Sequence, residues 1–384
     1  MIHPAEFPKP RWRLQLVTNC FSVALLAMPL SAQRSVNLTG KPLAALSEGL
    51  TKISGVRELS GNRALVTDRD ENALRLADFA ANDLRSIGTK GDGPNEYRLA
   101  TELYPMPASG SVMTGMGRVY QFSADAKITA VFPEPGNETG LLARQTILGA
   151  DQAGRLYFLR RQRYDDDSAA VIRWQPHSSR VDTVAIVAAP RPQTGTIDGS
   201  GHLRLSPDSP KALEAGDVWV VLPDGRVAGV RGNPYRIDFA DHRQITRGPL
   251  AGFTPRSVTA ADRAAFNAQR AKERMAGASG GPNAPAGGVR HPPPLEDADF
   301  AKVMPPFVGG ASIRVTPEGE IWVLRARAVT DSIPTYDIFD PTGKLIGKAT
   351  LKPHSTVVSF GNGTVYIARE DPADDLRYLE KYAR

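Results

Sequence analysis

The chain has 384 residues, of which 41% are hydrophobic and 23% are charged, the balance of an ordinary globular protein with one large domain or two smaller ones. Its formal net charge is only +6, and it has neither a run of lysine and arginine nor a basic stripe with interleaved aromatic residues, which argues against a nucleic-acid partner. The 35 glycines and 31 prolines favour many turns between short strands over long helices.

The first 32 residues have the pattern of a secretory signal peptide. Arg11 and Arg13 precede a mainly apolar stretch over 14–30, and residues 30–32 resemble a small-residue cleavage site. The strongly apolar part, 21–30, is far shorter than the roughly 20 residues that a membrane anchor needs. We therefore predict an exported protein, periplasmic or extracellular, with no stable membrane insertion after cleavage.

The only cysteine, Cys20, lies before most of this apolar core, where a lipoprotein cysteine would not lie. Cleavage after Ala32 leaves a mature chain without cysteine, so that it forms no disulfide and no thiolate metal site. Its stability is then expected to come from packing.

One pattern recurs along the rest of the chain: an apolar strand, a tight polar turn with glycine, and a second apolar strand. In the clearest copy, Ile313 and Val315 alternate with polar residues, a turn follows at 317–319, and a second apolar run follows at 321–324. Alternation and a glycine turn are the two signals of a β-hairpin. A third and a fourth strand follow around a turn at 340–343.

Six such units, of about four strands each, can be followed from residue 53 to residue 379. A repeated four-stranded sheet is the signature of a propeller blade, because blades in a ring bury both of their faces and protect their edges. A pair of β-sandwiches should not repeat the hairpin six times, and a β-solenoid should have a shorter period. We predict an all-β fold, a six-bladed β-propeller over 33–384, with the strand at 34–38 completing the last blade.

Residues 254–303 interrupt the pattern between the fourth and fifth units. Thr259-Ala-Ala-Asp262 is a capping box that starts a helix expected to reach Met275. Residues 277–294 are rich in Gly, Pro, Ala and Ser, which predicts a flexible loop. The insert is either a tolerated surface insertion or a lid over one end of the ring.

Several of these segments resemble a known superfamily. Val315-Thr-Pro-Glu-Gly319 and Ile338-Phe-Asp-Pro-Thr-Gly343 are similar to the repeat of NHL proteins, and 88–97 is similar to their linker between blades. The chain thus resembles the six-bladed propellers that include NHL-repeat and TolB-like proteins, and its closing strand, 376–382, resembles that of a bacterial exported subset. The resemblance implies a fold and no particular activity, because hydrolases, lyases and binding scaffolds share it.

Arginines recur after the apolar second strand of the units. Equivalent positions in a ring lie at one height around its axis, so they would form a basic collar on one face, suited to carboxylate, sulfate or phosphate groups. The candidate ligand-binding residues are Arg160, Arg231, Arg325, Arg327 and Arg369, with Arg161 close by. The alternative is that each arginine pairs with an acid of a neighbouring blade; the available acids are Asp68, Asp165, Asp166, Asp167, Asp331 and Asp371.

No catalytic residue, metal site or cofactor is predicted. No histidine has the spacing of a zinc site, and the triplet at 165–167 is a weak signal for calcium, which needs oxygen ligands from separated positions. Gly277-Ala-Ser-Gly-Gly281 has the letters of a nucleophile elbow, but it follows a predicted helix instead of a strand.

These observations favour an exported, non-catalytic binding or scaffolding propeller that acts as a monomer. Its partner would be a protein, or an anionic small molecule or glycan. The alternative is a calcium-dependent hydrolase or lactonase, which needs a Glu, Asn and Asp cluster at the axis. A structural surface protein within a larger assembly is the third hypothesis.

Overall fold

The computed structural model describes residues 33–135, 145–162, 166–178, 180–189, 193–197, 203–278 and 294–384. The predicted signal peptide, Asp165 of the acidic triplet and most of the predicted loop over 277–294 lie outside these residues. No helix of the described part is long and apolar enough to cross a bilayer.

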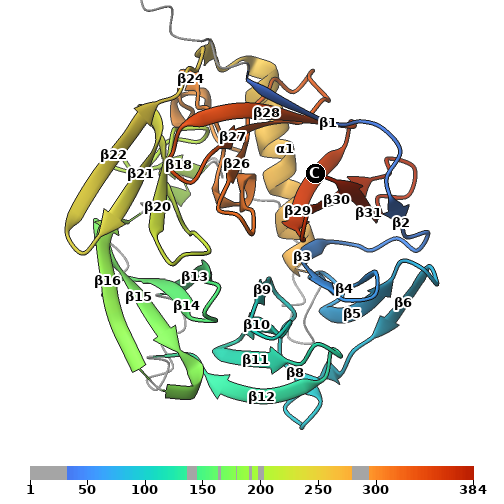
Figure 1. Ribbon diagram of the computed structural model, residues 1–384. Coiled ribbons are helices and arrows are strands. Elements are labelled where there is room, and N and C mark those ends of the chain that lie inside the picture. Colours follow the sequence, from blue (N-terminus) through green and yellow to red (C-terminus); the bar gives the residue numbers. More distant parts are fainter. Residues whose placement is uncertain are drawn as a thin grey trace, which may run out of the picture. The chain divides into compact units, whose positions relative to one another are not determined.

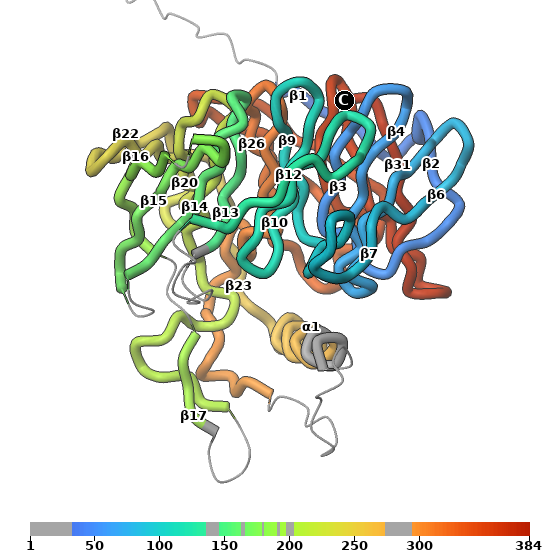
Figure 2. Tube along the Cα trace, turned by 90° about the horizontal axis from the view of Figure 1, so that it is seen from below, coloured from blue at the N-terminus to red at the C-terminus, as the bar shows by residue number. Residues whose placement is uncertain are grey.

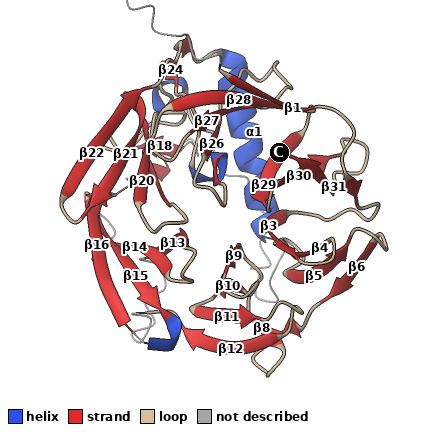
Figure 3. Ribbon diagram, viewed as in Figure 1, coloured by secondary structure: helices blue, strands red, loops and turns tan. Residues whose placement is uncertain are grey.

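Six sheets, antiparallel except for one added edge strand, stand around a central axis like the blades of a propeller (Figure 1). In each blade the first strand lies nearest the axis, and later strands lie progressively further out. Figure 3 shows that strands and turns make up nearly all of the ring. The predicted six-bladed all-β fold is confirmed.

The first three blades each use four consecutive strands. Blade 1 consists of β3 (Ile53–Leu59), β4 (Arg63–Asp68), β5 (Ala73–Asp78) and β6 (Asp83–Ser86). Blade 2 consists of β9 (Leu103–Pro105), β10 (Ser111–Gly115), β11 (Arg118–Phe122) and β12 (Ile128–Pro133). Blade 3 consists of β13 (Gln145–Ala150), β14 (Leu156–Arg160), β15 (Ser168–Gln175) and β16 (Arg180–Ala188), with the 3-10 turn η3 (Pro176–Ser178) between the last two.

The other three blades follow the same order. Blade 4 consists of β19 (Val218–Val221), β20 (Val227–Gly232), β21 (Tyr235–Asp241) and β22 (Gln244–Leu250). Blade 5 consists of β25 (Ile313–Val315), β26 (Ile321–Leu324), β27 (Thr335–Phe339) and β28 (Leu345–Leu351). Blade 6 has three consecutive strands, β29 (Ser355–Phe360), β30 (Thr364–Glu370) and β31 (Arg377–Ala383).

Blade 5 illustrates how the recurring sequence pattern makes a blade. The turn between β25 and β26 places Gly319 at a φ of 89°, which costs glycine nothing and other residues strain. Alternation then sends Trp322 into the space between blades, where it is fully buried, 5.0 Å between ring centroids from Phe360 of blade 6. Burying a side chain of this size contributes about 2–3 kcal/mol. The hydrophobic core therefore lies between neighbouring blades.

The ring closes differently from the sequence prediction. β1 (Arg34–Leu38) does not join the last blade; it pairs in parallel with β28 as a fifth strand of blade 5. A strand of two residues further on, β2 (Ala44–Ala45), completes blade 6 by antiparallel pairing with β31. The prediction was wrong because the outer edges of blades 5 and 6 are both open to an alternating strand, and the segment 34–45 crosses from one to the other.

The two ends of the ring have different structures. At the turn face, short turns join the first and second strands of each blade. At the opposite end, the insert face, first strands begin and second strands end. Two long connections leave the blades there, 189–217 between blades 3 and 4 and 251–312 between blades 4 and 5. Figure 2 shows their elements on one side of the blades.

These connections form a small module with its own apolar cluster. Its centre is Ala212, Leu295 and Phe300, all buried. Its elements are β17 (Gly195–Ile197), β18 (Leu203–Leu205), β23 (Arg256–Ser257), β24 (Val303–Met304), α1 (Ala260–Ala278), η4 (Asp297–Asp299) and η5 (Gly310–Ser312). The linker between blades 1 and 2 adds a short parallel pair, β7 (Thr89–Lys90) and β8 (Glu96–Tyr97).

The helix α1 begins with the predicted capping box. The amide of Asp262 donates to Thr259 Oγ1 over 3.2 Å, and the amide of Thr259 donates to Asp262 Oδ2 over 2.9 Å. Asp262 also accepts from the amide of Val329 in blade 5, and Lys272 lies 3.4 Å from Asp375 in blade 6. The helix is therefore tethered across the insert face from blade 5 to blade 6 (Figure 1).

Candidate functional site

The six innermost strands surround a channel along the axis of the ring. The channel contains a cavity of about 480 Å³ that is lined by residues from all six strands. Each inner strand is paired on one side only, so its unpaired backbone edge faces the axis. This edge and the side chains of the strand border the channel. The channel is the place where single residues of separate blades come together.

The strand registers define one layer of this channel. In each blade, one inner-strand residue pairs with the second-strand residue that lies three positions before one reference position at or next to the end of that strand. The reference positions are the collar arginines in blades 3 to 6 and their equivalents in blades 1 and 2, namely Asp68, Gly115, Arg160, Arg231, Arg325 and Arg369. Going around the ring from blade 1, these inner-strand residues are Arg57, Tyr104, Gly149, Val220, Arg314 and Ser359. All six line the cavity. We call them the arginine layer; its polar arc runs from Arg314 through Ser359 and Arg57 to Tyr104.

Arg57 has no anionic partner in this layer. Among the described residues it makes neither a hydrogen bond nor an ion pair, and its Nε is buried without a partner. Burial lowers the pKa of the guanidinium, opposed by the nearby charge of Glu58. A partly buried charge without a partner costs free energy, because the lost hydration is not replaced. An anion in the channel would replace it.

Arg314 is held by backbone carbonyls alone. Its Nε donates to the carbonyl of Val358 in blade 6, and its Nη1 donates to the carbonyls of Ala311 and Ile313. No carboxylate of the described chain forms an ion pair with it, and Nη2 has no hydrogen bond there. The carbonyls orient the guanidinium without neutralising its charge, so it keeps the ability to bind a carboxylate through two nitrogens.

Tyr104 and Glu102 lie on the channel wall that blade 2 contributes. The Tyr104 hydroxyl donates to Glu102 Oε2 over 2.7 Å. Burial, and then the charge of Glu102, raises the pKa of Tyr104 well above its ordinary value. The phenol therefore stays protonated and acts as a hydrogen-bond donor.

The arginines predicted to form a collar lie at the insert face. Arg160, Arg231, Arg325 and Arg369 occur at the ends of second strands, which meet at that end of the ring. Three of them form ion pairs within their own blade: Arg231 with Asp217 (3.1 Å), Arg325 with Asp337 (3.5 Å), and Arg369 with Glu380 (2.9 Å). Arg369 also lies 3.8 Å from Asp371, one of the acids that the sequence analysis named as available partners. The expectation of acids from neighbouring blades is wrong for these three. That the collar binds a ligand stays a prediction.

The remaining predicted residues have other surroundings. Arg160 donates to the carbonyl of Pro135 over 2.6 Å, and the exposed Arg327 donates to the carbonyl of Asp331 over 3.0 Å. Asp68, considered as a partner for an arginine, instead accepts from the backbone and hydroxyl of Thr51 and from the amide of Lys52.

Replacing Arg325 with alanine is expected to lower the free energy of unfolding by about 2 kcal/mol at pH 7, because it removes the cation that is paired with the buried Asp337. Burial already raises the pKa of Asp337 in spite of Arg325. The stability that the protonated Asp337 contributes is therefore complete below its unfolded-state pKa, near 3.9, and is lost as the pH rises through its folded-state pKa. Urea unfolding at pH 5 and pH 7 should show a larger loss at pH 7.

The exposed Arg327→Ala is the control for this variant, with an expected change below about 0.5 kcal/mol. The double variant Arg325→Ala, Asp337→Asn should recover part of the loss. Unchanged stability in Arg325→Ala would show that the ion pair contributes nothing and would make this arginine available to a ligand.

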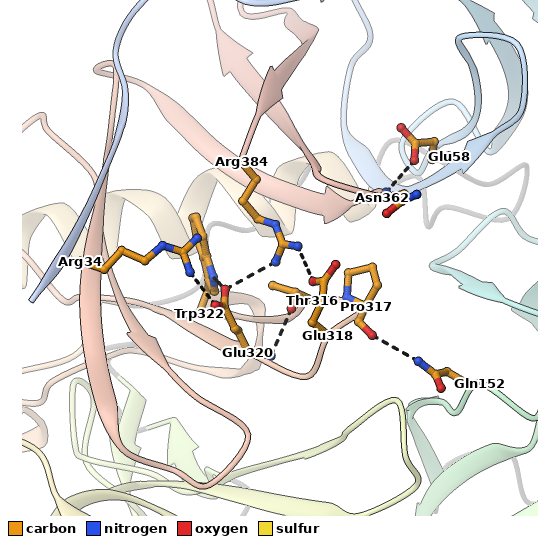
Figure 4. Close-up of polar contacts among 10 residues, drawn as sticks. All are labelled: Arg34, Glu58, Gln152, Thr316, Pro317, Glu318, Glu320, Trp322, Asn362 and Arg384. Atoms are coloured by element: carbon orange, nitrogen blue, oxygen red, sulfur yellow. Dashed lines mark hydrogen bonds and ion pairs between the residues drawn. The ribbon is translucent and has the colours of Figure 1, made fainter.

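The turn face is held by contacts between blades, which Figure 4 shows. Glu58 of blade 1 accepts from the amide of Asn362 of blade 6, and Gln152 of blade 3 donates to the carbonyl of Pro317 of blade 5 over 3.3 Å. Arg384 forms ion pairs with Glu318 and Glu320. These contacts fix the turns at this end of the channel.

The described residues contain no group of three or more His, Cys, Asp or Glu side chains that could hold a metal ion. Asp166 and Asp167, from the weak calcium signal, belong to this searched part of the chain, and Asp165 lies outside it.

No protein-family model matches the chain, and no curated protein sequence matches it either. Among solved structures, it is similar to regucalcin, a calcium-binding protein from Agrobacterium tumefaciens, with 11% identity over 91% of this chain and 97% of that one and a TM-score of 0.43. A member of the DUF4221 family from Bacteroides vulgatus has 10% identity over 90% and 98% of the two chains and a TM-score of 0.47. Virginiamycin B lyase from Staphylococcus aureus has 10% identity over 89% and 87% and a TM-score of 0.38. At such identities the likeness concerns the fold alone.

The sequence analysis missed Arg57, Tyr104 and Arg314. Each lies in an ordinary strand pattern, and no motif marks it. The one signal that could have found them is their position relative to the second strand that follows. Counting three positions back from the collar arginines, or from Asp68 and Gly115 in blades 1 and 2, and then taking the paired inner-strand residue selects the whole arginine layer.

Proposed function

We propose that the protein is an exported, non-catalytic binding propeller that takes a small organic anion into its central channel, at Arg57 and Arg314. The observation that carries this proposal is the arginine layer, in which two guanidinium groups from blades 1 and 5 border one cavity without a carboxylate partner among the described residues. Most other arginines that line the blades have an acid beside them, as Arg231, Arg325 and Arg369 do.

The shape of the layer supports a small ligand. The polar arc faces Gly149 and Val220 across the channel, so that one wall offers donors and the other offers apolar or open surface. Sites for small molecules commonly combine apolar walls with a few converging polar groups. Export rests on the signal-peptide pattern of the first 32 residues.

A thermal-shift titration of the purified protein tests the proposal, with succinate, glutarate, phosphate and calcium chloride as probes. An anion at ten times its dissociation constant stabilises the native state by about 1.4 kcal/mol, which raises the melting temperature. We expect a rise with a carboxylate probe that Arg57→Met and Arg314→Met each reduce. Arg247→Met, which changes an exposed arginine on β22, should keep the full rise.

Two results would overturn the proposal. One is an anion-dependent rise that both channel variants retain. The other is a rise with calcium alone that EDTA reverses, which would favour the calcium-dependent hydrolase.

A further inference from the structure

The channel has a neck where two cavities meet. Besides the cavity around the arginine layer, a second cavity of about 690 Å³ lies toward the insert face, lined partly by 214–220 and 307–310. Five residues line both cavities: Glu102, Leu148, Val220, Ile313 and Arg314. These five residues form the boundary that the two cavities share, which is the neck, and it carries one acidic residue, Glu102, and one basic residue, Arg314.

Glu102 has no cationic partner among the described residues, in contrast to three other carboxylates of these walls. Glu58, Asp151 and Asp217 each lie within 3.2 Å of a lysine or arginine nitrogen. The only hydrogen bond of Glu102 among the described residues comes from the Tyr104 hydroxyl, and its side chain is exposed to the channel. A carboxylate with free acceptor positions in a narrow space is suited to an ammonium group.

The acidic Glu102 and the basic Arg314 lie on opposite sides of the neck. Glu102 immediately precedes the inner strand of blade 2 and Arg314 belongs to that of blade 5, and these two blades face each other across a ring of six (Figure 1). No ion pair joins them within the described chain, so the two charges are presented to the space between them. Leu148, Val220 and Ile313 supply apolar surface at the same level.

We propose that the ligand is a zwitterion, with an ammonium group bound at Glu102 and a carboxylate bound at Arg314 and Arg57. The class is that of small amino acids and short peptides, whose two charges lie on one small molecule. This inference rests on the proposed function and adds to it the requirement for a cationic group at a stated residue.

Calorimetric titration with matched probes tests it. The matched pairs are butyrate with 4-aminobutyrate and pentanoate with 5-aminopentanoate. Glycine, glycylglycine and butylamine are further probes. We expect at least one amino-carboxylate to bind tenfold or more tightly than its matched carboxylate. Glu102→Gln should abolish this preference without weakening the binding of the plain carboxylate, because it removes a negative charge from the neck, whereas Arg314→Met should weaken the binding of both.

Glu71→Gln, at a surface position in blade 1, is the control and should keep the preference. Melting curves without ligand check that Glu102→Gln is folded. Equal affinities of the amino and plain carboxylates, or a preference that Glu102→Gln retains, would overturn the zwitterion and leave anion binding in place. Absence of binding by every carboxylate would overturn the anion site as well.

Discussion

Replacing Arg57 with methionine is expected to stabilise the unliganded protein and to weaken the binding of a carboxylate at least tenfold. The first effect follows because the variant removes a partly buried charge that has no partner among the described residues, while it keeps the length of the side chain. We expect a gain of about 1 kcal/mol in the free energy of unfolding. The second effect follows because a charge-assisted hydrogen bond contributes about 1.5–3 kcal/mol to binding.

Chemical unfolding and calorimetric titration with succinate measure the two effects on the same samples. Arg314→Met should lose affinity without the gain in stability, because it removes three hydrogen bonds to backbone carbonyls. Arg247→Met should change neither quantity. If Arg57→Met lowered the free energy of unfolding and left the affinity unchanged, Arg57 would be a structural residue and no part of a binding site.

Replacing Glu58 with alanine is expected to lower the free energy of unfolding by about 3 kcal/mol, because this side chain joins the first blade to the last. It accepts hydrogen bonds from the amide of Asn362, the hydroxyls of Thr364 and Tyr366, and it lies 3.2 Å from Lys381 Nζ. Four donors of blade 6 thus converge on one carboxylate of blade 1. Its removal leaves largely buried donors and a lysine without their acceptor.

The pH dependence gives a second test of the same contact. Burial alone would raise the pKa of Glu58, but hydrogen bonds from Asn362, Thr364, Tyr366 and Lys381 together hold it below its usual value. The stabilisation is therefore present above the unfolded-state pKa, near 4.3, and is lost as the pH falls through the lower folded-state pKa. Melting temperatures from pH 3 to pH 7 should show a gap between the wild type and Glu58→Gln that narrows below pH 4.

The exposed Glu48 provides the matched control, since Arg75 is the one residue of the described chain that forms an ion pair with it. Glu48→Ala should change stability by less than about 1 kcal/mol. A loss in Glu58→Ala no larger than that of the control would mean that the ring does not depend on this contact.

Local patterns were sufficient to predict the blades. A hairpin such as β25–β26 is specified by the alternation of Ile313 and Val315 and by the turn at Gly319, all within a few residues. The capping box at Thr259 and Asp262 is equally local, and the structure contains it. The partner of β1 could not be predicted in this way, because the choice between blades 5 and 6 depends on which edge lies nearer in space.

The candidate site is harder to predict because its residues are far apart in sequence. Arg57 and Arg314 come together only through the registers of inner strands in different blades. The collar was visible because its arginines recur at one position of the repeat. Of their partners, Asp371 was among the acids named from the sequence, whereas Asp337 and Glu380 look like ordinary polar residues of the strands that follow.

The pairing of β1 and β2 has a consequence for the order in which the molecule is built. Arg34 pairs with Gly347, and Ala44 pairs with Lys381. The strands β1 and β2 therefore cannot pair until the strands β28 and β31, which are synthesised some 300 residues later, are available. Contacts over such separations form slowly, since the entropy of closing the loop is lost before any contact is gained. Until then, the outer edges of two blades stay unpaired and can bind a strand of another chain. The propeller is therefore most exposed to aggregation during the last step of its folding, and a truncation at either end would make that state permanent.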